Sequence, residues 1–409
     1  MDASKLFSNL NEQYIFMERY VNAGSPSGFT EIHTTSERTN PFKGIDRFPL
    51  LVFDDSDVQS QVIGEQLPSF WDPSTNYAHP DSINSPIHVN AGRILRTTDY
   101  YVSPTSGGRT MFLWSIKPEG YLKLTYDVAR IGRVDRQLSV KHCLASYESS
   151  STLKSTIDRG GFPNTLAIQL ERTAKVSFLP YDGQMYEWGV IYREKEPYPY
   201  AGKTRQLVPG FSLFYGNPEI GHVPLLIQFI RLGGYEPNDY LMRLLKMMVD
   251  CYWNIVLKCA FHIESHGQNC LFEVDESYQL VRMVIKDMDS VDKDIPLAEQ
   301  LGLNTVWESY PQCCFDKSLY YYDIRASFMY DFKLGEYMLT PLIEVVANEY
   351  HLNVTKIQSE LRDYVQATYA HELPEGYFPA NGCWYDCDNT ERKPGTQREY
   401  YAHTNPKYR

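Results

Sequence analysis

The feature that most constrains the fold is a run of apolar residues with helical spacing in the second half of the chain. Its members recur at the i, i+3, i+4 and i+7 intervals of one helix face: Leu241, Leu244, Leu245, Met248, Tyr252, Ile255, Val256 and Cys259. Asn238 or Asp239 has a side chain suited to cap the first turn. The pattern therefore predicts a long amphipathic helix that ends near Cys259.

Polar residues follow the predicted helix directly. The segment 262–269 carries the polar side chains Glu264, His266, Gln268 and Asn269. Apolar runs at 270–275 and 280–286 then predict a β-hairpin, which would return Asp287 to that segment. An imidazole, amide groups and a carboxylate in one small volume suit a nucleoside triphosphate and its magnesium ion.

Two other interpretations of this segment stay open on the residues alone. Gly267 could form an ordinary helix C-cap in the left-handed conformation. Alternatively, His262 and His266 lie four residues apart with Glu264 between them, which raises a zinc site. The zinc-protease pattern places its glutamate directly after the first histidine, and the sequence offers no evident third ligand, so zinc is the weaker interpretation.

Strand signals dominate the region after residue 109. β-branched and aromatic runs separated by turn residues predict strands at 110–114, 121–128, 165–172, 175–179 and 188–194. Before them, residues 1–22 predict a short helix, and the Ser-, Pro-, Asn- and Gly-rich stretch 23–108 predicts loops.

Helical patterns return towards the C-terminus, at roughly 320–351 and 353–369. Gly335 and Pro341 predict a break or kink in the first of these helices, and the tail from 380 is expected to be irregular. Taken together, the sequence predicts an α+β fold. A mixed or antiparallel sheet region precedes a mostly helical region, with the site between them.

Composition narrows the class of function. The formal net charge of −12 disfavours a nucleic-acid or anionic-membrane binder, because such proteins need a basic surface. No stretch reaches the roughly 18 apolar residues of a membrane span, and the N-terminus lacks the pattern of a signal peptide. We therefore expect a cytoplasmic protein whose scattered cysteines are buried free thiols.

Basic residues upstream add to the nucleotide interpretation. Ser106 and Arg109 flank a Gly-Gly pair at the entry to a strand, where backbone N–H groups can approach phosphate oxygens; an ordinary glycine turn is the alternative. Lys123 lies within an apolar strand, where a buried ammonium needs an anionic partner. Arg133 and Arg136 would share one face of a helical turn, or simply a solvated basic face.

In this order, the segments resemble the siderophore synthetases that work independently of nonribosomal peptide synthetases, the aerobactin-synthetase family of acyl-adenylating ligases. Residues 104–110 resemble the Pro-Thr-Ser-Ser-x-Arg-Thr segment of that family, and 123–136 resemble its Lys-Leu strand leading to Ile-Thr-Ser-x-x-Arg. Residues 264–269 resemble its Glu-Ala-His-x-Gln-Asn motif, and 286–287 its Arg-Asp. The resemblance covers roughly 95–409.

The resemblance implies the thumb–fingers–palm fold of these enzymes with a reduced N-terminal domain. The corresponding regions are a reduced N-terminal region at 1–100, a sheet-rich ATP-binding region at 101–235 and a helical region at 236–409. It further implies a ligase that uses ATP and Mg²⁺, activates a small carboxylic acid as its adenylate and condenses it with an amine or hydroxyl nucleophile in natural-product biosynthesis. A homodimer is compatible with the resemblance.

Residue roles carry over by position. Ser106, Arg109 and Lys123 would hold the ATP phosphates together with Arg133, and His266 would contact the α-phosphate.

The remaining roles concern the nucleotide, the metal and the acid. Gln268 and Asn269 would fix the nucleotide, Asp287 would bind magnesium with Asn269 and Glu264, and Arg136 would hold a carboxylate of the acid substrate.

The chain also departs from the family pattern. Gly132 and Arg133 stand where the family has Thr-Ser, and the His-Pro-x-His-Pro motif has no counterpart beyond His79-Pro80. The acid therefore stays open between citrate and another di- or tricarboxylate. Two alternative functions also stay open: a kinase-like phosphotransferase, with Glu264 as its candidate base, and a non-catalytic paralogue.

Overall fold

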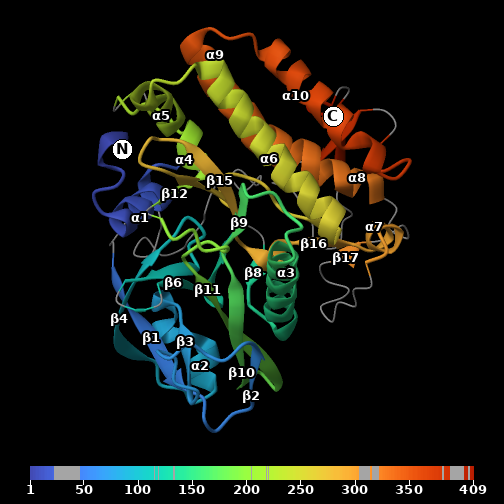
Figure 1. Ribbon diagram of the computed structural model, residues 1–409. Helices are drawn as coiled ribbons and strands as arrows, with labels where there is room; N and C mark the ends of the chain where they lie inside the picture. Colours follow the sequence, from blue (N-terminus) through green and yellow to red (C-terminus); the bar gives the residue numbers. More distant parts are fainter. Residues whose placement is uncertain are drawn as a thin grey trace.

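The computed structural model describes residues 1–22, 47–114, 116–117, 119–131, 134–203, 205–217, 219, 221–303, 314–315, 322–379, 382–386, 400–403 and 406–409. Most strands gather in the lower half of the molecule in Figure 1, and most helices lie in the upper half. A smaller sheet lies between them. The predicted α+β architecture, a sheet region followed by a mostly helical region, is confirmed.

The large sheet has eight strands in the order β2-β10-β11-β6-β5-β4-β1-β3, all paired antiparallel. Its strands are β1 (Phe48–Asp54), β2 (Ser60–Gly64), β3 (Thr75–Ala78), β4 (Arg96–Pro104), β5 (Thr110–Leu113), β6 (Gly120–Leu124), β10 (Glu171–Tyr181) and β11 (Gln184–Glu194).

The expectation of loops across 23–108 is wrong for its described part, because β1 to β4 form half of this sheet. These strands are short, and β2 pairs with β10, more than a hundred residues along the chain. Local residue patterns carry little of that long-range pairing. Residues 23–46 lie outside the described chain.

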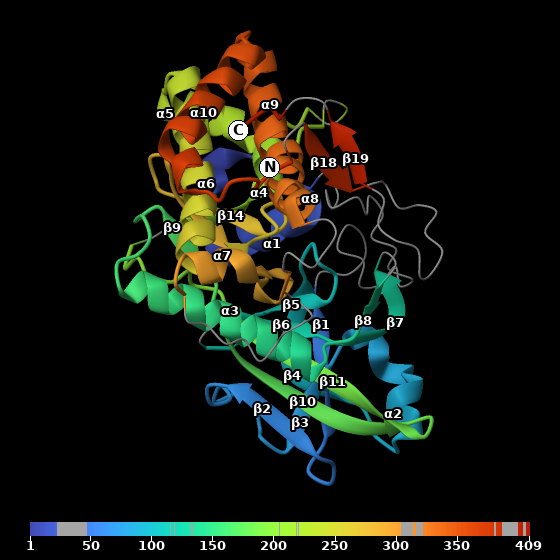
Figure 2. The same cartoon turned by 90° about the vertical axis from the view of Figure 1, so that its right-hand side faces the viewer.

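Two helices cover the large sheet. The short α2 (Pro86–Asn90) places His88 against Phe53 and Trp188, and these aromatic rings belong to the core of that sheet. The longer α3 (Val140–Asp158) packs on β10 and lies between the sheet and the helical region (Figure 2). The residue pattern of α3 did not predict a helix, because its serine-rich sequence has a weak apolar face.

The small sheet has the order β12-β14-β15-β9. Its strands are β12 (Gln206–Pro209), β14 (Cys270–Val274), β15 (Leu280–Ile285) and β9 (Leu166–Ile168). The predicted hairpin is confirmed as β14 and β15, and β15 also pairs parallel with β9. A small core of Tyr14, Phe112, Tyr121 and Val284 joins the two sheets to α1 (Leu10–Tyr20).

The predicted long helix is α6 (Pro237–Cys259), whose apolar face is buried. Its cap is Glu236, whose carboxylate accepts the Asp239 N–H at 2.7 Å, so the predicted caps Asn238 and Asp239 lie two and three residues too late. Pro237 suits the first helical position, because it has no N–H to satisfy there. The helix ends at Ala260 in the left-handed conformation, so Gly267 is not its C-cap.

The helix predicted over 320–351 forms three consecutive segments in its described part. They are α8 (Tyr322–Ser327), the π-helix η5 (Phe328–Leu339) and α9 (Thr340–Tyr350). The predicted irregularity near Gly335 and Pro341 therefore takes the form of a π-helix followed by a new α-helical start. The second predicted helix is α10 (Val354–Thr368).

The tail is only partly irregular, because β18 (Cys383–Asp386) pairs with β19 (Tyr400–His403). The remaining helices are α4 (Gly210–Phe214), α5 (Leu225–Gly233), α7 (Ile295–Gln300), and the 3-10 turns η1 (Ala3–Lys5), η2 (Pro80–Asn84), η4 (Met288–Ser290) and η6 (Ala370–Glu372). The remaining strands are β7 (Tyr126–Ile131), β8 (Val134–Arg136), β13 (Phe261–His262), β16 (Asp292–Asp294) and β17 (Cys314–Phe315).

Cys143, Cys251, Cys259 and Cys270 are buried and unbonded to other cysteines. Burial raises the pKa of the Cys259 thiol to about 11 and that of Cys270 to about 12, which keeps both protonated at neutral pH. No helix within the described chain is long and apolar enough to cross a membrane.

Candidate active site

The loop between β4 and β5 is anchored by a buried carboxylate of α1. Glu18 Oε2 accepts the backbone N–H of Ser106 at 3.1 Å and its hydroxyl at 2.5 Å. The other oxygen, Oε1, accepts the Tyr14 hydroxyl at 2.6 Å and the Lys286 ammonium at 2.7 Å. We call these four residues, Tyr14, Glu18, Ser106 and Lys286, the Glu18 clamp. It connects α1, the β4–β5 loop and the end of β15.

The carboxylate of the clamp is ionised although it is buried. Burial by itself would raise the pKa of Glu18, but the Lys286 ammonium and the hydrogen bonds from Ser106 and Tyr14 outweigh it and lower this pKa. The Glu18 side chain is wholly buried and that of Lys286 nearly so, so the two form an ion pair out of water. The N–H and the hydroxyl of Ser106 therefore both donate hydrogen bonds within the protein.

A second group of charges lies where β6 and β11 meet the end of β15. Lys123 Nζ donates to Asp287 Oδ1 at 2.6 Å and also bonds Asp289. Arg193 Nη2 donates to the same Asp287 oxygen at 2.7 Å. Arg109 reaches to within 3.7 Å of Asp289 Oδ2. Together, Arg109, Lys123, Arg193, Asp287 and Asp289 form the charge cluster.

The strand register explains how two of these cations come together. Lys123 lies opposite Ile191, and Arg193 lies opposite Tyr121. Because side chains alternate between the faces of a sheet, Lys123 and Arg193 project from the same face. A third carboxylate, that of Glu171, accepts a hydrogen bond from Arg193 Nε at 2.6 Å.

Electrostatics hold the Asp287 carboxylate in its ionised form. Burial by itself would raise the pKa of Asp287, but Lys123 and Arg193 outweigh it and keep this pKa well below its usual range. Asp287 also has a φ of 76°, in the left-handed region. That conformation costs about 1–2 kcal/mol in a residue with a side chain, so the surrounding bonds must fix it.

His266 lies in a turn after β13, where it is almost completely buried. Its Nε2 is 3.8 Å from Glu264 Oε2, and Lys333 Nζ lies 3.2 Å from the other Glu264 oxygen. Burial lowers the pKa of His266 more than Glu264 raises it, so the imidazole is neutral at pH 7. Its Nδ1 has no hydrogen-bond partner among the described residues.

Gly267 allows this turn to pack closely against α4. A Cβ atom at Gly267 would lie 2.7 Å from the backbone N of Phe211, which donates to the Gly267 carbonyl at 3.1 Å. The glycine is therefore required by close approach rather than by a helix cap.

Backbone contacts place the turn beside both the β4–β5 loop and the hairpin. A Cβ atom at Gly107 would lie 3.5 Å from the Gln268 amide nitrogen, so these residues are neighbours. Asn269 is buried, and its carbonyl accepts the Lys286 N–H at 3.1 Å. The structure thus brings the β4–β5 loop, the His266 turn and the residue before Asp287 together.

The expectation of a helical turn is wrong for Arg136. Arg136 ends strand β8, which pairs antiparallel with β7. Side chains of a strand alternate between its two faces, so the helical rule that residues three apart share a face does not apply there. Gly132 and Arg133 lie outside the described residues, as does the side chain of Arg136.

The charged residues of the site that were not among the predicted site residues include Glu18, Glu171, Arg193 and Asp289. Glu18 has no sequence signal, because its partners come from β4–β5 and β15. Arg193 belongs to the same network and could have been found by the reasoning used for Lys123, since it is a cation within an apolar strand. Asp289 follows Asp287 at the second position and shares Lys123 with it.

The paired carboxylates that could hold a magnesium ion are Asp287 and Asp289, whereas the predicted ligands were Asp287, Asn269 and Glu264. No group of three or more His, Cys, Asp or Glu side chains that could hold a metal occurs in the part of the chain that the structure describes. Glu264 is bound by Lys333 and faces His266. Asp287 and Asp289 share one ammonium, and two carboxylates match what Mg²⁺ uses alongside phosphate oxygens.

No protein-family model matches the sequence, and no curated protein matches it either. The structure is similar to the petrobactin biosynthesis protein AsbB from Bacillus anthracis str. Sterne, with a TM-score of 0.77 and 14% identity, over 97% of this chain and 75% of that one. For the ATP-bound aerobactin synthetase IucA from a hypervirulent pathotype of Klebsiella pneumoniae, the values are 0.72 and 13%, over 98% and 79%.

The aerobactin synthetase IucC from the same source gives a TM-score of 0.62 at 14% identity, over 83% of this chain and 65% of that one. The chain is thus shorter than each of these three proteins. At such identities the similarity shows the fold alone: the chain has the fold of the siderophore synthetases that work independently of nonribosomal peptide synthetases.

Proposed function

We propose that the chain is a ligase that uses ATP and Mg²⁺ to adenylate a carboxylic acid and then joins it to an amine or hydroxyl group. The observation that carries the proposal is the convergence of the charge cluster, the β4–β5 loop and the His266 turn. The fold supports it, because similar structures include an ATP-bound aerobactin synthetase and a petrobactin biosynthesis protein. Siderophore or related natural-product biosynthesis is the matching pathway class.

Charge explains why these residues suit adenylation. A carboxylate must attack an anionic phosphorus atom, so both anions need neutralising. Arg109, Lys123 and Arg193 are the cations available to the phosphates, but in the charge cluster they are paired with carboxylates. A magnesium ion held by Asp287 and Asp289 would neutralise phosphate charge when bound. Lys123 and Arg109 would then be free to bond phosphate oxygens.

His266 would meet the nucleotide as a hydrogen-bonding side chain. Its Nδ1 is the ring atom left without a partner in the described chain, and Glu264 lies on the Nε2 side. A phosphate oxygen beside Nδ1 requires an N–H there. Negative charge of the ligand would raise the pKa of the imidazole and favour protonation of both nitrogens, with Glu264 stabilising the cation.

The reaction balances in two steps. A carboxylate oxygen of the acid attacks the α-phosphorus, and the bond to the β-phosphate oxygen breaks to release pyrophosphate. An amine or hydroxyl then attacks the acyl carbonyl, loses its proton and displaces AMP. Orientation supplies much of the rate, because neither step requires a strongly basic side chain. In this proposal Arg136 holds a carboxylate of the acid, which is a di- or tricarboxylate such as citrate.

Isotope exchange between pyrophosphate and ATP, measured with a panel of di- and tricarboxylic acids, tests the function. We expect exchange that depends on one acid, with AMP as the nucleotide product once an amine is added. Formation of ADP would instead establish a phosphotransferase, and ATP binding without exchange for any acid would indicate a non-catalytic protein.

Variants connect the exchange to the site. Lys123→Met and His266→Gln should each lower exchange by at least about a hundredfold, the loss typical when one group that stabilises transition-state charge is removed. Lys141→Met, which changes an exposed lysine on α3, is the matched control and should retain exchange. Full activity in both site variants would refute the site assignment.

A further inference from the structure

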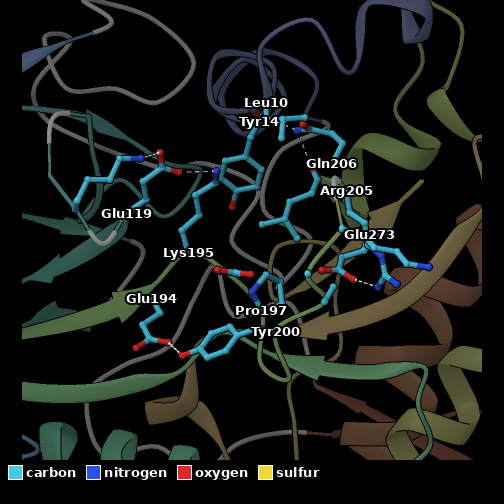
Figure 3. Close-up of a pocket in the computed structure, with 16 residues that line it drawn as sticks. Leu10, Tyr14, Glu119, Glu194, Lys195, Pro197, Tyr200, Arg205, Gln206 and Glu273 are labelled. Atoms are coloured by element: carbon cyan, nitrogen blue, oxygen red, sulfur yellow. Dashed lines mark hydrogen bonds and ion pairs between the residues drawn. The ribbon is translucent and has the colours of Figure 1, made fainter. Parts of the chain in front are cut away.

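A cavity of about 770 Å³ is lined by Glu194 at the end of β11 and by residues of the segment that follows it (Figure 3). Strand alternation separates the two places: Arg193 faces the charge cluster, whereas the next residue, Glu194, lines the cavity. Nothing in the proposed adenylation uses this cavity. Its wall also contains Lys195, Tyr200, Arg205 and Gln206.

The lining carries equal numbers of charges of each sign. The basic residues are Lys117, Lys195, Lys203 and Arg205, and the acidic ones are Glu119, Glu194, Glu196 and Glu273. A balanced lining offers no net attraction to a polyanion or to a polycation. It favours a ligand that carries separated charges of both signs, because each end can then meet its complement.

Arg205 is not needed to neutralise the carboxylate that it contacts. Its Nη1 donates to Glu273 at 2.6 Å, but Arg282 already donates to both oxygens of that carboxylate, at 2.5 and 2.7 Å. Lys203, two residues earlier, is exposed and makes no ion pair within the described chain. The two side chains therefore provide a positive end that a ligand carboxylate can bind.

One acceptor of the lining is buried and one is exposed. Gln206 is 1% exposed, and its amide nitrogen donates to the carbonyls of Leu10 at 3.2 Å and Leu207 at 2.9 Å. Its Oε1 has no donor among the described residues, although a buried acceptor normally has one. Glu196 also makes no ion pair with any described residue.

We propose that this cavity is a second ligand site, which binds a small zwitterion of the amino-acid class. The carboxylate of the ligand bonds Arg205 and Lys203, and its ammonium group bonds Glu196. This proposal rests on the lining alone and not on the adenylation chemistry. Tyr14 belongs to both places, since its ring lines the cavity and its hydroxyl bonds Glu18 of the clamp.

Titration calorimetry of the whole chain, without ATP, tests the site with three probes: L-glutamine, succinate and putrescine. We expect L-glutamine to bind with a dissociation constant of about a millimolar or tighter, and at least tenfold more tightly than the dianion or the dication. Equal or tighter binding of succinate or putrescine would overturn the proposal, as would the absence of L-glutamine binding.

Variants locate the bound probe. Arg205→Gln should weaken L-glutamine binding at least tenfold while the protein stays folded, because Arg282 still neutralises Glu273. Glu196→Gln removes the acceptor for the ammonium group and should weaken binding as well. Arg96→Gln, an exposed arginine of β4, is the matched control. Binding that survives Arg205→Gln but is lost in Asp287→Asn would place the probe in the charge cluster and refute the second site.

Discussion

Replacing Glu18 by leucine should expose how strongly the clamp depends on one buried charge. The substitution keeps a similar volume but leaves the Lys286 ammonium buried without its anion, together with the donors of Ser106 and Tyr14. Breaking a buried ion pair by removing one partner typically costs about 3–5 kcal/mol of stability. We therefore expect Glu18→Leu to lower the free energy of unfolding by that amount, and Lys286→Met to cost a similar amount.

The double variant separates charge from packing. With both charges gone, three neutral donors remain without an acceptor: the Ser106 N–H, its hydroxyl and the Tyr14 hydroxyl. At about 1 kcal/mol each, they predict a cost of about 3 kcal/mol. The sum of the two single losses in unfolding free energy should thus exceed the loss in Glu18→Leu/Lys286→Met by at least about 3 kcal/mol.

Urea unfolding at pH 7, followed by tryptophan fluorescence, measures all four corners of this cycle. Single losses that add up to the double loss within about 0.5 kcal/mol would refute the reasoning. The lowered pKa of Glu18 sets the pH dependence: the contribution of Glu18 to stability is present above the usual value of 4.5 and is lost as pH falls through the folded pKa. The penalty of Glu18→Leu should therefore shrink in acid.

Three further predictions concern other parts of the molecule. Gly189→Ala should lower the free energy of unfolding in urea by about 2 kcal/mol or more, because its Cβ would lie 2.2 Å from the Leu138 carbonyl oxygen; a loss below 0.5 kcal/mol would contradict this packing. Burial lowers the pKa of His88 to about 3, so stability should fall as pH drops below 6.5. At pH 5 the loss should be about 2 kcal/mol, and an unchanged acid dependence in His88→Phe would reject His88 as its source. ATP binding at pH 7 should be coupled to proton uptake at His266, seen in calorimetry as a dependence on buffer ionisation enthalpy that His266→Gln removes; equal uptake in that variant would reject the assignment.

Local sequence patterns predicted α6, β14 and β15. The helical period of α6 and the apolar runs of β14 and β15 are visible within a short window, and all three elements are present. By contrast, β1 to β4 were missed because their partners are distant, and α3 because its buried face includes serines. The start of α6 was misplaced because Glu236, a less common cap than Asn or Asp, performs that function.

The candidate site divides in the same way. Ser106, Lys123, His266 and Asp287 belong to segments that could be found by residue type, and contacts within the fold connect their segments. Glu18 could not be found, because an acidic residue on an exposed-looking helix turn has no mark of burial until the sheets pack around it. Long-range electrostatic pairing is a property of the assembled fold, so it leaves no period in the sequence.

The alkylation rates of the buried cysteines report how fast the native protein opens around them. Cys143 lies in the core between α3 and the large sheet, whereas Cys251 lies in the core of the helical region. A thiol that is both buried and protonated reacts with an alkylating reagent only when its surroundings open. Equal labelling rates at the two positions would mean that the regions open as one cooperative unit. Faster labelling at one of them would identify the region that loosens first while the other stays closed.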